Sequence, residues 1–302
     1  LAFGLESYPV FGLNTPGERA MAVTHADGNM SLDLAVEEVK QYTSNEAEVT
    51  EIRMKDKVYP FVLKQIYKAY KRTDIISTWV EVENHGKKPI TLYRFASAFM
   101  PIPRGDNWMT HFHGFWGAEC TQDEEKLTNG QKVISNKDGL ANTETDNPSF
   151  MLTMDGRPQE ENGHVLGGTL AWTGTYLIKM DVHNTKFNVS AGINEETSHY
   201  ILEPDEVFTT PEFAMTYSTN GKGGVSRAFH RWAREYKLNQ GKRPHDILLN
   251  SWEGVYFKVN QKEMDQMMEA FSAMGGELFV MDDGWFGNKY PRDGANSSLG
   301  DW

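Results

Sequence analysis

Apolar and polar residues alternate in short runs over residues 1–223, which is the pattern of β-strands that are buried on one face. The clearest alternation lies in Thr78–Val82, and polar or glycine-containing turns separate the runs at fairly even spacing. Three segments predict hairpins: 21–34, with Asp27-Gly28 at the turn, 75–99 and 167–192. Many short strands at this spacing are typical of a β-sandwich, so we expect a mostly β fold.

The pattern changes to helical spacing near residue 224. Val225, Phe229 and Trp232 recur on one face of a predicted helix over 224–239, and charged residues occupy the other face. The following stretch, 239–246, is polar and contains glycine and proline. We therefore interpret 224–246 as a helix and a linker between two domains.

Residues 247–302 begin with a β-α-β pattern. A short apolar strand (247–251) precedes a helix that Asn260 can cap, with Glu263 three residues later as in a capping box. Gly275 and Gly276 end the helix, and a second apolar strand follows at 277–281. One such unit cannot bury a parallel sheet, so we expect 247–302 to be the start of a larger, truncated α/β domain.

Two adjacent carboxylates, Asp282 and Asp283, follow the second of these strands, and Trp252 follows the first. Sites in parallel α/β folds lie at the C-terminal ends of the strands. Carboxylates can accept hydrogen bonds from sugar hydroxyls and an indole can stack on a sugar ring, so the three residues suit binding of a sugar better than catalysis. Neighbours in one chain cannot flank a scissile bond as an acid and a nucleophile do. The alternative is an Asp-Asp-Gly turn with no role beyond structure.

Charge and length exclude several classes of function. The 302 residues carry a formal net charge of −12 without a basic stripe, so we expect no binding to nucleic acid. No apolar run approaches membrane length, so we expect no membrane partner. Cys120 is the only cysteine and is expected to be a buried thiol; one cysteine fits the cytoplasm or the periplasm and slightly favours the cytoplasm.

A metal site is the other chemistry that the sequence raises. His111 and His113 lie two residues apart, so on a strand they share a face and could bind zinc. No convincing third and fourth ligands accompany them. We therefore expect no metal site.

Three blocks, "NSWE" at 250, "DDGWFG" at 282 and "LGDW" at 299, resemble the start of the catalytic barrel in the α-galactosidases of glycoside hydrolase family 36, in order and in spacing. Upstream, "FHGFWGAE" and "SRAFHRW" follow in the family's order. The resemblance implies a β-supersandwich over 1–223, with some strands preceding residue 1, and the beginning of a (β/α)8 barrel over 247–302.

The same resemblance implies a retaining hydrolase that acts on terminal α-D-galactosyl residues of melibiose and raffinose without a cofactor. It implies that Trp252, Asp282 and Asp283 line the galactose pocket. The family's nucleophile and acid/base lie on later barrel strands with no counterpart here, so we expect this chain alone to be inactive.

Several alternatives stay open at this point. Within the fold they are an α-N-acetylgalactosaminidase or a galactosyltransferase of the raffinose-synthase type; in another class, the alternative is a non-catalytic carbohydrate-binding sandwich. The complete enzyme could also be a homo-oligomer. In tetrameric members, the loop that resembles Tyr8–Arg19 reaches a neighbour's active site. This chain keeps Arg19 but lacks an obvious aspartate there, which leaves the loop's role open.

Overall fold

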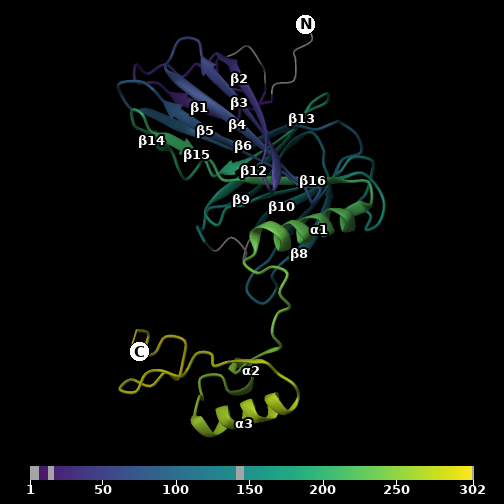
Figure 1. Ribbon diagram of the computed structural model, residues 1–302, viewed down its shortest axis with the longest axis vertical. Helices are drawn as coiled ribbons and strands as arrows, with labels where there is room; N and C mark the ends of the chain where they lie inside the picture. Colours follow the sequence, from purple (N-terminus) through teal and green to yellow (C-terminus); the bar gives the residue numbers. More distant parts are fainter. Residues whose placement is uncertain (1–6, 13–16, 141–145, 301–302) are drawn as a thin grey trace. The chain divides into compact units, whose positions relative to one another are not determined.

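The computed structural model describes residues 7–12, 17–140 and 146–300 (Figure 1). The chain divides into two compact units, Leu1–Leu238 and Asn239–Trp302. Residues 13–16 of the Tyr8–Arg19 loop and the last two residues of the "LGDW" block lie outside the described residues. No helix of the described residues is long and apolar enough to cross a membrane.

The first unit contains two antiparallel sheets. The smaller has six strands in the order β1-β6-β13-β12-β9, and β14 pairs with β6. Its strands are β1 (Met21–Thr24), β6 (Ile90–Pro101), β9 (Gly130–Asn136), β12 (Tyr176–Val182), β13 (Phe187–Ile193) and β14 (Tyr200–Leu202).

The larger sheet has ten strands in the order β2-β3-β4-β5-β16-β11-β10-β7-β8, and β15 pairs with β5. Its strands are β2 (Leu34–Thr43), β3 (Ala47–Asp56), β4 (Phe61–Tyr70), β5 (Ile76–Asn84), β7 (Trp108–His113), β8 (Thr121–Lys126), β10 (Asp146–Thr153), β11 (Val165–Leu170), β15 (Val207–Thr209) and β16 (Phe213–Ser218). The predicted mostly β fold is confirmed.

The hairpin predicted over 75–99 is wrong, although both of its strands exist. β5 and β6 belong to different sheets. Val80 and Val82 of β5 lie in the same buried cluster as Leu92 and Phe95 of β6. The apolar faces of the two strands therefore pack against each other across the sandwich. Each strand forms its backbone hydrogen bonds with other strands, β5 with β4 and β16, and β6 with β1 and β13.

The other two predicted hairpins had different outcomes. The turn at Asp27-Gly28 forms, with Gly28 at φ +88°, but β1 pairs with β6 and β2 with β3, so 21–34 is not a hairpin. Within 167–192, β12 and β13 do pair directly, and a hydrogen bond from His183 N to Lys186 O closes their turn. Turn chemistry alone thus did not decide which strands pair.

The predicted amphipathic helix forms as α1 (Gly221–Trp232), which continues as a π-helical turn over Ala233–Lys237. Its buried residues include Val225, Ala228 and Trp232, as the helical spacing predicts. The helix approaches strand β11 so closely that a Cβ on Gly167 would lie 2.3 Å from a methyl group of Val225. Glycine at this position therefore allows the helix to pack against the sheet.

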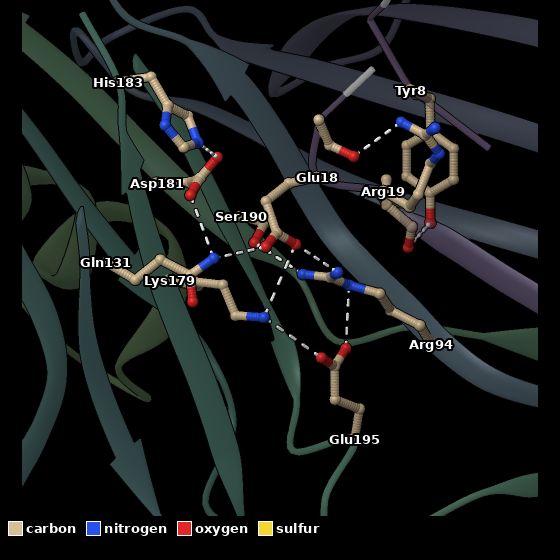
Figure 2. Close-up of polar contacts among 12 residues, drawn as sticks. Tyr8, Glu18, Arg19, Arg94, Gln131, Lys179, Asp181, His183, Ser190 and Glu195 are labelled. Atoms are coloured by element: carbon tan, nitrogen blue, oxygen red, sulfur yellow. Dashed lines mark hydrogen bonds and ion pairs between the residues drawn. The ribbon is translucent and has the colours of Figure 1, made fainter. Parts of the chain in front are cut away.

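A charged cluster fixes the segment before β1 to the smaller sheet (Figure 2). Glu18 accepts a hydrogen bond from Arg94 of β6 at 2.6 Å, and Lys179 of β12 lies 3.6 Å away. Glu195 contacts the same two cations at 2.9 and 3.5 Å. Burial alone would raise the pKa of Glu18, but the hydrogen bond and charge of Arg94, with help from Lys179 and Gln131, outweigh it and lower the pKa.

We expect Glu18→Gln to lower the thermal midpoint at neutral pH, because the substitution leaves Arg94 and Lys179 with a single carboxylate. The lowered pKa means that the ion pairs stabilise the fold fully above the unfolded pKa of glutamate and lose that effect as pH falls through the folded value. Melting curves from neutral to acid pH should show the difference from wild type shrinking. Glu161→Gln is the control, because its ion pair with Arg227 is exposed and 3.5 Å long. A difference that stays constant with pH would contradict this account.

The second unit contains β17 (Leu248–Asn250), α2 (Trp252–Val255), α3 (Gln261–Ala273) and β18 (Leu278–Val280), and its two strands pair in parallel. The predicted β-α-β unit is therefore confirmed. Asn260 caps α3 by accepting a hydrogen bond from Glu263 N at 3.1 Å, and its amide donates to the Glu263 carboxylate at 2.9 Å. Gly275, at φ +89°, ends the helix as predicted. The short helix α2 was not predicted.

Candidate functional site

The parallel pairing of β17 and β18 brings their C-terminal ends together. Asn250 is the partner of Val280 in the register, and Ser251 N donates to Val280 O at 2.9 Å. The fully buried Ser251 hydroxyl then accepts a hydrogen bond from Asp282 N at 3.0 Å. The residues that follow the two strands are thereby joined at one edge.

Asp282 lies at the centre of this edge. Its Oδ2 accepts a hydrogen bond from the Asn250 amide at 2.6 Å, and its Oδ1 accepts one from Asp283 N at 2.6 Å. The carbonyl oxygen of the Asn250 side chain accepts from Trp252 N at 2.8 Å, so Asn250 connects Asp282 to Trp252. A carboxylate has about four acceptor positions, and two are used here, so Asp282 can still accept hydrogen bonds from a ligand.

Asp283 is held by an arginine. Arg292 donates to it from Nε at 2.8 Å and from Nη2 at 2.6 Å, a bidentate pair. The Arg292 guanidinium, hydrogen-bonded to this carboxyl, lowers the pKa of Asp283. The two carboxylates therefore differ: Asp283 is paired through both oxygens, whereas Asp282 is bound only by neutral donors.

Arg292 also organises the chain beyond the carboxylates. Its Nη1 donates to the carbonyl oxygens of Gly294 and Ser297 at 2.7 and 2.6 Å. The guanidinium lies over the rings of Phe257 and Phe286, at 5.2 and 5.4 Å from their centroids, and Arg292 is only 8% exposed. Arg292 was not predicted from the sequence as part of the site. The one signal for it in the sequence is its position a few residues after two adjacent carboxylates, which need a cation nearby.

Trp252 and Gly284 complete the arrangement. The half-buried Trp252 ring packs edge-on against Phe257 at 4.9 Å and an interplanar angle of 90°. Gly284 has φ +106°, and a Cβ there would lie 2.7 Å from the Phe257 carbonyl oxygen. Glycine is required on both counts. Phe257 thus contacts both parts of the site: its backbone lies against the turn at Gly284, and its ring packs against the indole of Trp252.

The other candidates of the sequence analysis form no site. The rings of His111 and His113 lie 5.8 Å apart, and His113 pairs with Asp123. Among the described residues, no group of three or more His, Cys, Asp or Glu residues could hold a metal ion. Cys120 is exposed, so the expectation of a buried thiol was wrong: it lies at φ +57° in the turn between β7 and β8, outside the sandwich core.

Comparison with known proteins covers both units. The "Glycosyl hydrolase family 36 N-terminal domain" matches residues 2–203, and the "Melibiase" domain matches residues 207–302. Alpha-galactosidase AgaA from Geobacillus stearothermophilus is 30% identical over 317 residues, which cover 99% of this chain and 43% of AgaA. Alpha-galactosidase C from Emericella nidulans is 35% identical over 241 residues, which cover 78% of this chain and 32% of that protein.

The solved structures agree with these matches. A variant of AgaA in complex with stachyose superposes with a TM-score of 0.91 at 29% identity, covering 98% of this chain and 43% of that one. The fold is thus a sandwich of the family 36 type followed by the start of its barrel. The chain belongs to glycoside hydrolase family 36. It spans between 32% and 43% of the length of the curated relatives.

Proposed function

We propose that this chain is the N-terminal part of a retaining α-galactosidase that hydrolyses terminal α-D-galactosyl residues of galacto-oligosaccharides such as melibiose and raffinose. The observation that carries the proposal is the joined strand edge, where Asp282 and Trp252 are connected through Asn250. It lies within the region that matches the melibiase domain. Relatives of this chain are named alpha-galactosidases, and variants of one of them were crystallised with stachyose and raffinose.

In this proposal Asp282, Asp283 and Trp252 form part of the galactose pocket, with different roles. Asp282 accepts hydrogen bonds from sugar hydroxyls, because its oxygens retain free acceptor positions. The Trp252 indole stacks on the C–H face of the ring. Asp283, paired with Arg292, holds the loop in shape and offers any remaining acceptor position to the sugar.

The proposal is tested on an enzyme that carries the whole barrel. We expect hydrolysis of melibiose and raffinose with galactose released first as the α anomer, which proton NMR can follow. Faster cleavage of an α-N-acetylgalactosaminide, or transfer of galactose to sucrose in place of hydrolysis, would replace the proposed activity with one of the two alternatives within the fold. Binding of galactosides without any turnover would favour a non-catalytic protein.

The 302-residue chain alone should not hydrolyse a chromogenic α-galactoside. A retaining glycosidase needs two carboxyl groups about 5–5.5 Å apart on opposite sides of the scissile bond. The carboxylates at the described strand ends, Asp282 and Asp283, are consecutive in the chain and lie on one side. Release of nitrophenol above a blank by the purified chain would contradict this expectation. The control is a parallel purification from cells that do not express the chain, which must release none if contaminating enzymes are excluded.

A further inference from the structure

The outer face of strands β2–β5 carries a groove that the proposed function does not use. These strands lie side by side in the larger sheet (Figure 1). The groove has a volume of about 590 Å³ and adjoins a second hollow of about 260 Å³, and Glu51 lines both. The first volume falls within the range of roughly 300–1,000 Å³ that is usual for ligand sites.

The groove combines an apolar floor with aromatic walls. Val49 and Ile66, only 6% and 2% exposed, form the floor. Glu51, Ile66 and Trp79 are cross-strand partners in one row of the sheet, and Tyr42 is the partner of Val49 on the edge strand. The two aromatic residues are thus separated by three strand spacings, roughly 14 Å. An extended ligand can lie between them over the floor.

The charges around the groove are largely paired within the protein. Lys64 contacts Glu81 at 2.8 Å, Lys68 contacts Glu46 at 3.1 Å, and the Tyr42 hydroxyl donates to Glu51 at 2.9 Å. The two ion pairs cancel, and Glu51 keeps its negative charge while it accepts from the neutral Tyr42 hydroxyl, so the groove does not attract an anionic ligand. The oxygen and nitrogen atoms of these residues retain hydrogen-bonding capacity. The rim therefore suits a neutral ligand rich in hydroxyl groups.

Two polar groups of the groove are not used by the protein. Within the part of the chain that the structure describes, neither the indole N–H of Trp79 nor the side-chain amide of Asn45 has a hydrogen-bond partner. An indole can offer its face to the C–H groups of a sugar and its N–H to a hydroxyl. We propose that this groove is a second carbohydrate-binding site, which takes a short, uncharged stretch of glycan across β2–β5.

This inference does not depend on the hydrolytic activity, because the groove lies on the sandwich and not at the barrel strands. Affinity electrophoresis of the chain in gels containing galactomannan tests it. We expect retardation of the wild type, and a Kd at least about tenfold weaker for Trp79→Ala, which removes the stacking surface. Trp172→Ala removes another partly exposed indole outside the groove and should migrate like the wild type.

Two further variants keep the test decisive. Tyr42→Ala changes a residue that is 49% exposed on the edge strand, so it should weaken binding without disturbing the core even if Trp79→Ala folds poorly. Asp282→Ala should retain the retardation, which separates this groove from the galactose pocket. The proposal is overturned if the wild type is not retarded, or if both groove variants are retarded as strongly as the wild type. It is equally overturned if Asp282→Ala alone abolishes binding, or if the groove variants act only by dissolving a dimer seen in size-exclusion chromatography.

Discussion

In an enzyme that carries the whole barrel, Asp282→Ala is expected to lower kcat/KM for an α-galactoside at least about 100-fold, with little change in thermal midpoint. Galactose differs from glucose in its axial O4 hydroxyl, and a pocket that selects galactose must hold that hydroxyl. Sites built to bond a hydroxyl can discriminate by about 10⁴-fold, so a 100-fold loss is a lower bound. Stability should change little, because Asp282 accepts from one amide and one backbone N–H and balances no cation among the described residues.

Steady-state kinetics on melibiose and a thermal melt of each variant measure both parts of this expectation. Asp265→Ala is the matched control, since it removes an exposed carboxylate of α3 in the same unit and should leave kcat/KM unchanged. The kcat/KM of Asp282→Asn should lie between those of Asp282→Ala and the wild type, because an amide keeps one acceptor oxygen but loses the charge. If Asp282→Ala retains the wild-type kcat/KM, the Asp-Asp-Gly sequence is a turn with no role in binding sugar.

Local signals in the sequence were enough to predict the β-α-β unit. Asn260 and Glu263 cap α3 through contacts three residues apart, and Gly275 ends the helix through its own backbone conformation. These features depend on neighbours in the chain, which a pattern can reveal. Pairing between β5 and β6 was not predictable in this way, because the two strands turn their apolar faces toward each other from different sheets. Alternation of apolar and polar residues identifies a strand but not the strand with which it pairs.

The candidate site, too, could be predicted from the sequence only in part. The rule that sites lie at the carboxyl ends of parallel strands was enough to select Trp252, Asp282 and Asp283 as candidates from their places after the strands. It treated the two aspartates as equivalent, and the structure distinguishes them through Arg292. That arginine comes from an irregular stretch with neither helical nor strand periodicity. Its place is fixed by carbonyl oxygens and aromatic rings that only the folded chain brings together.

Arg292→Ala is expected to reduce both stability and activity of the enzyme with its whole barrel. The substitution leaves the Asp283 carboxylate without its cation and the carbonyl oxygens of Gly294 and Ser297 without their donor. Unpaired, partly buried polar groups are costly, so the thermal midpoint should fall. The loop after β18 would also shift, and a displacement of about 1 Å near a reacting centre can lower the rate about 100-fold. Arg292→Lys should not restore either property, because an ammonium group cannot form the bidentate contact.

The pH dependence distinguishes this role from simple loss of packing. Because the pKa of Asp283 is lowered in the folded protein, its pair with Arg292 stabilises the fold above the unfolded pKa of aspartate. That stabilisation disappears as pH falls through the folded value. The difference in thermal midpoint between wild type and Arg292→Ala should therefore narrow in acid. Lys289→Ala, a change to an exposed cation three positions earlier, should alter neither the midpoint nor kcat/KM. An unchanged midpoint for Arg292→Ala at neutral pH, with normal kcat/KM, would mean that the loop holds its shape without the ion pair.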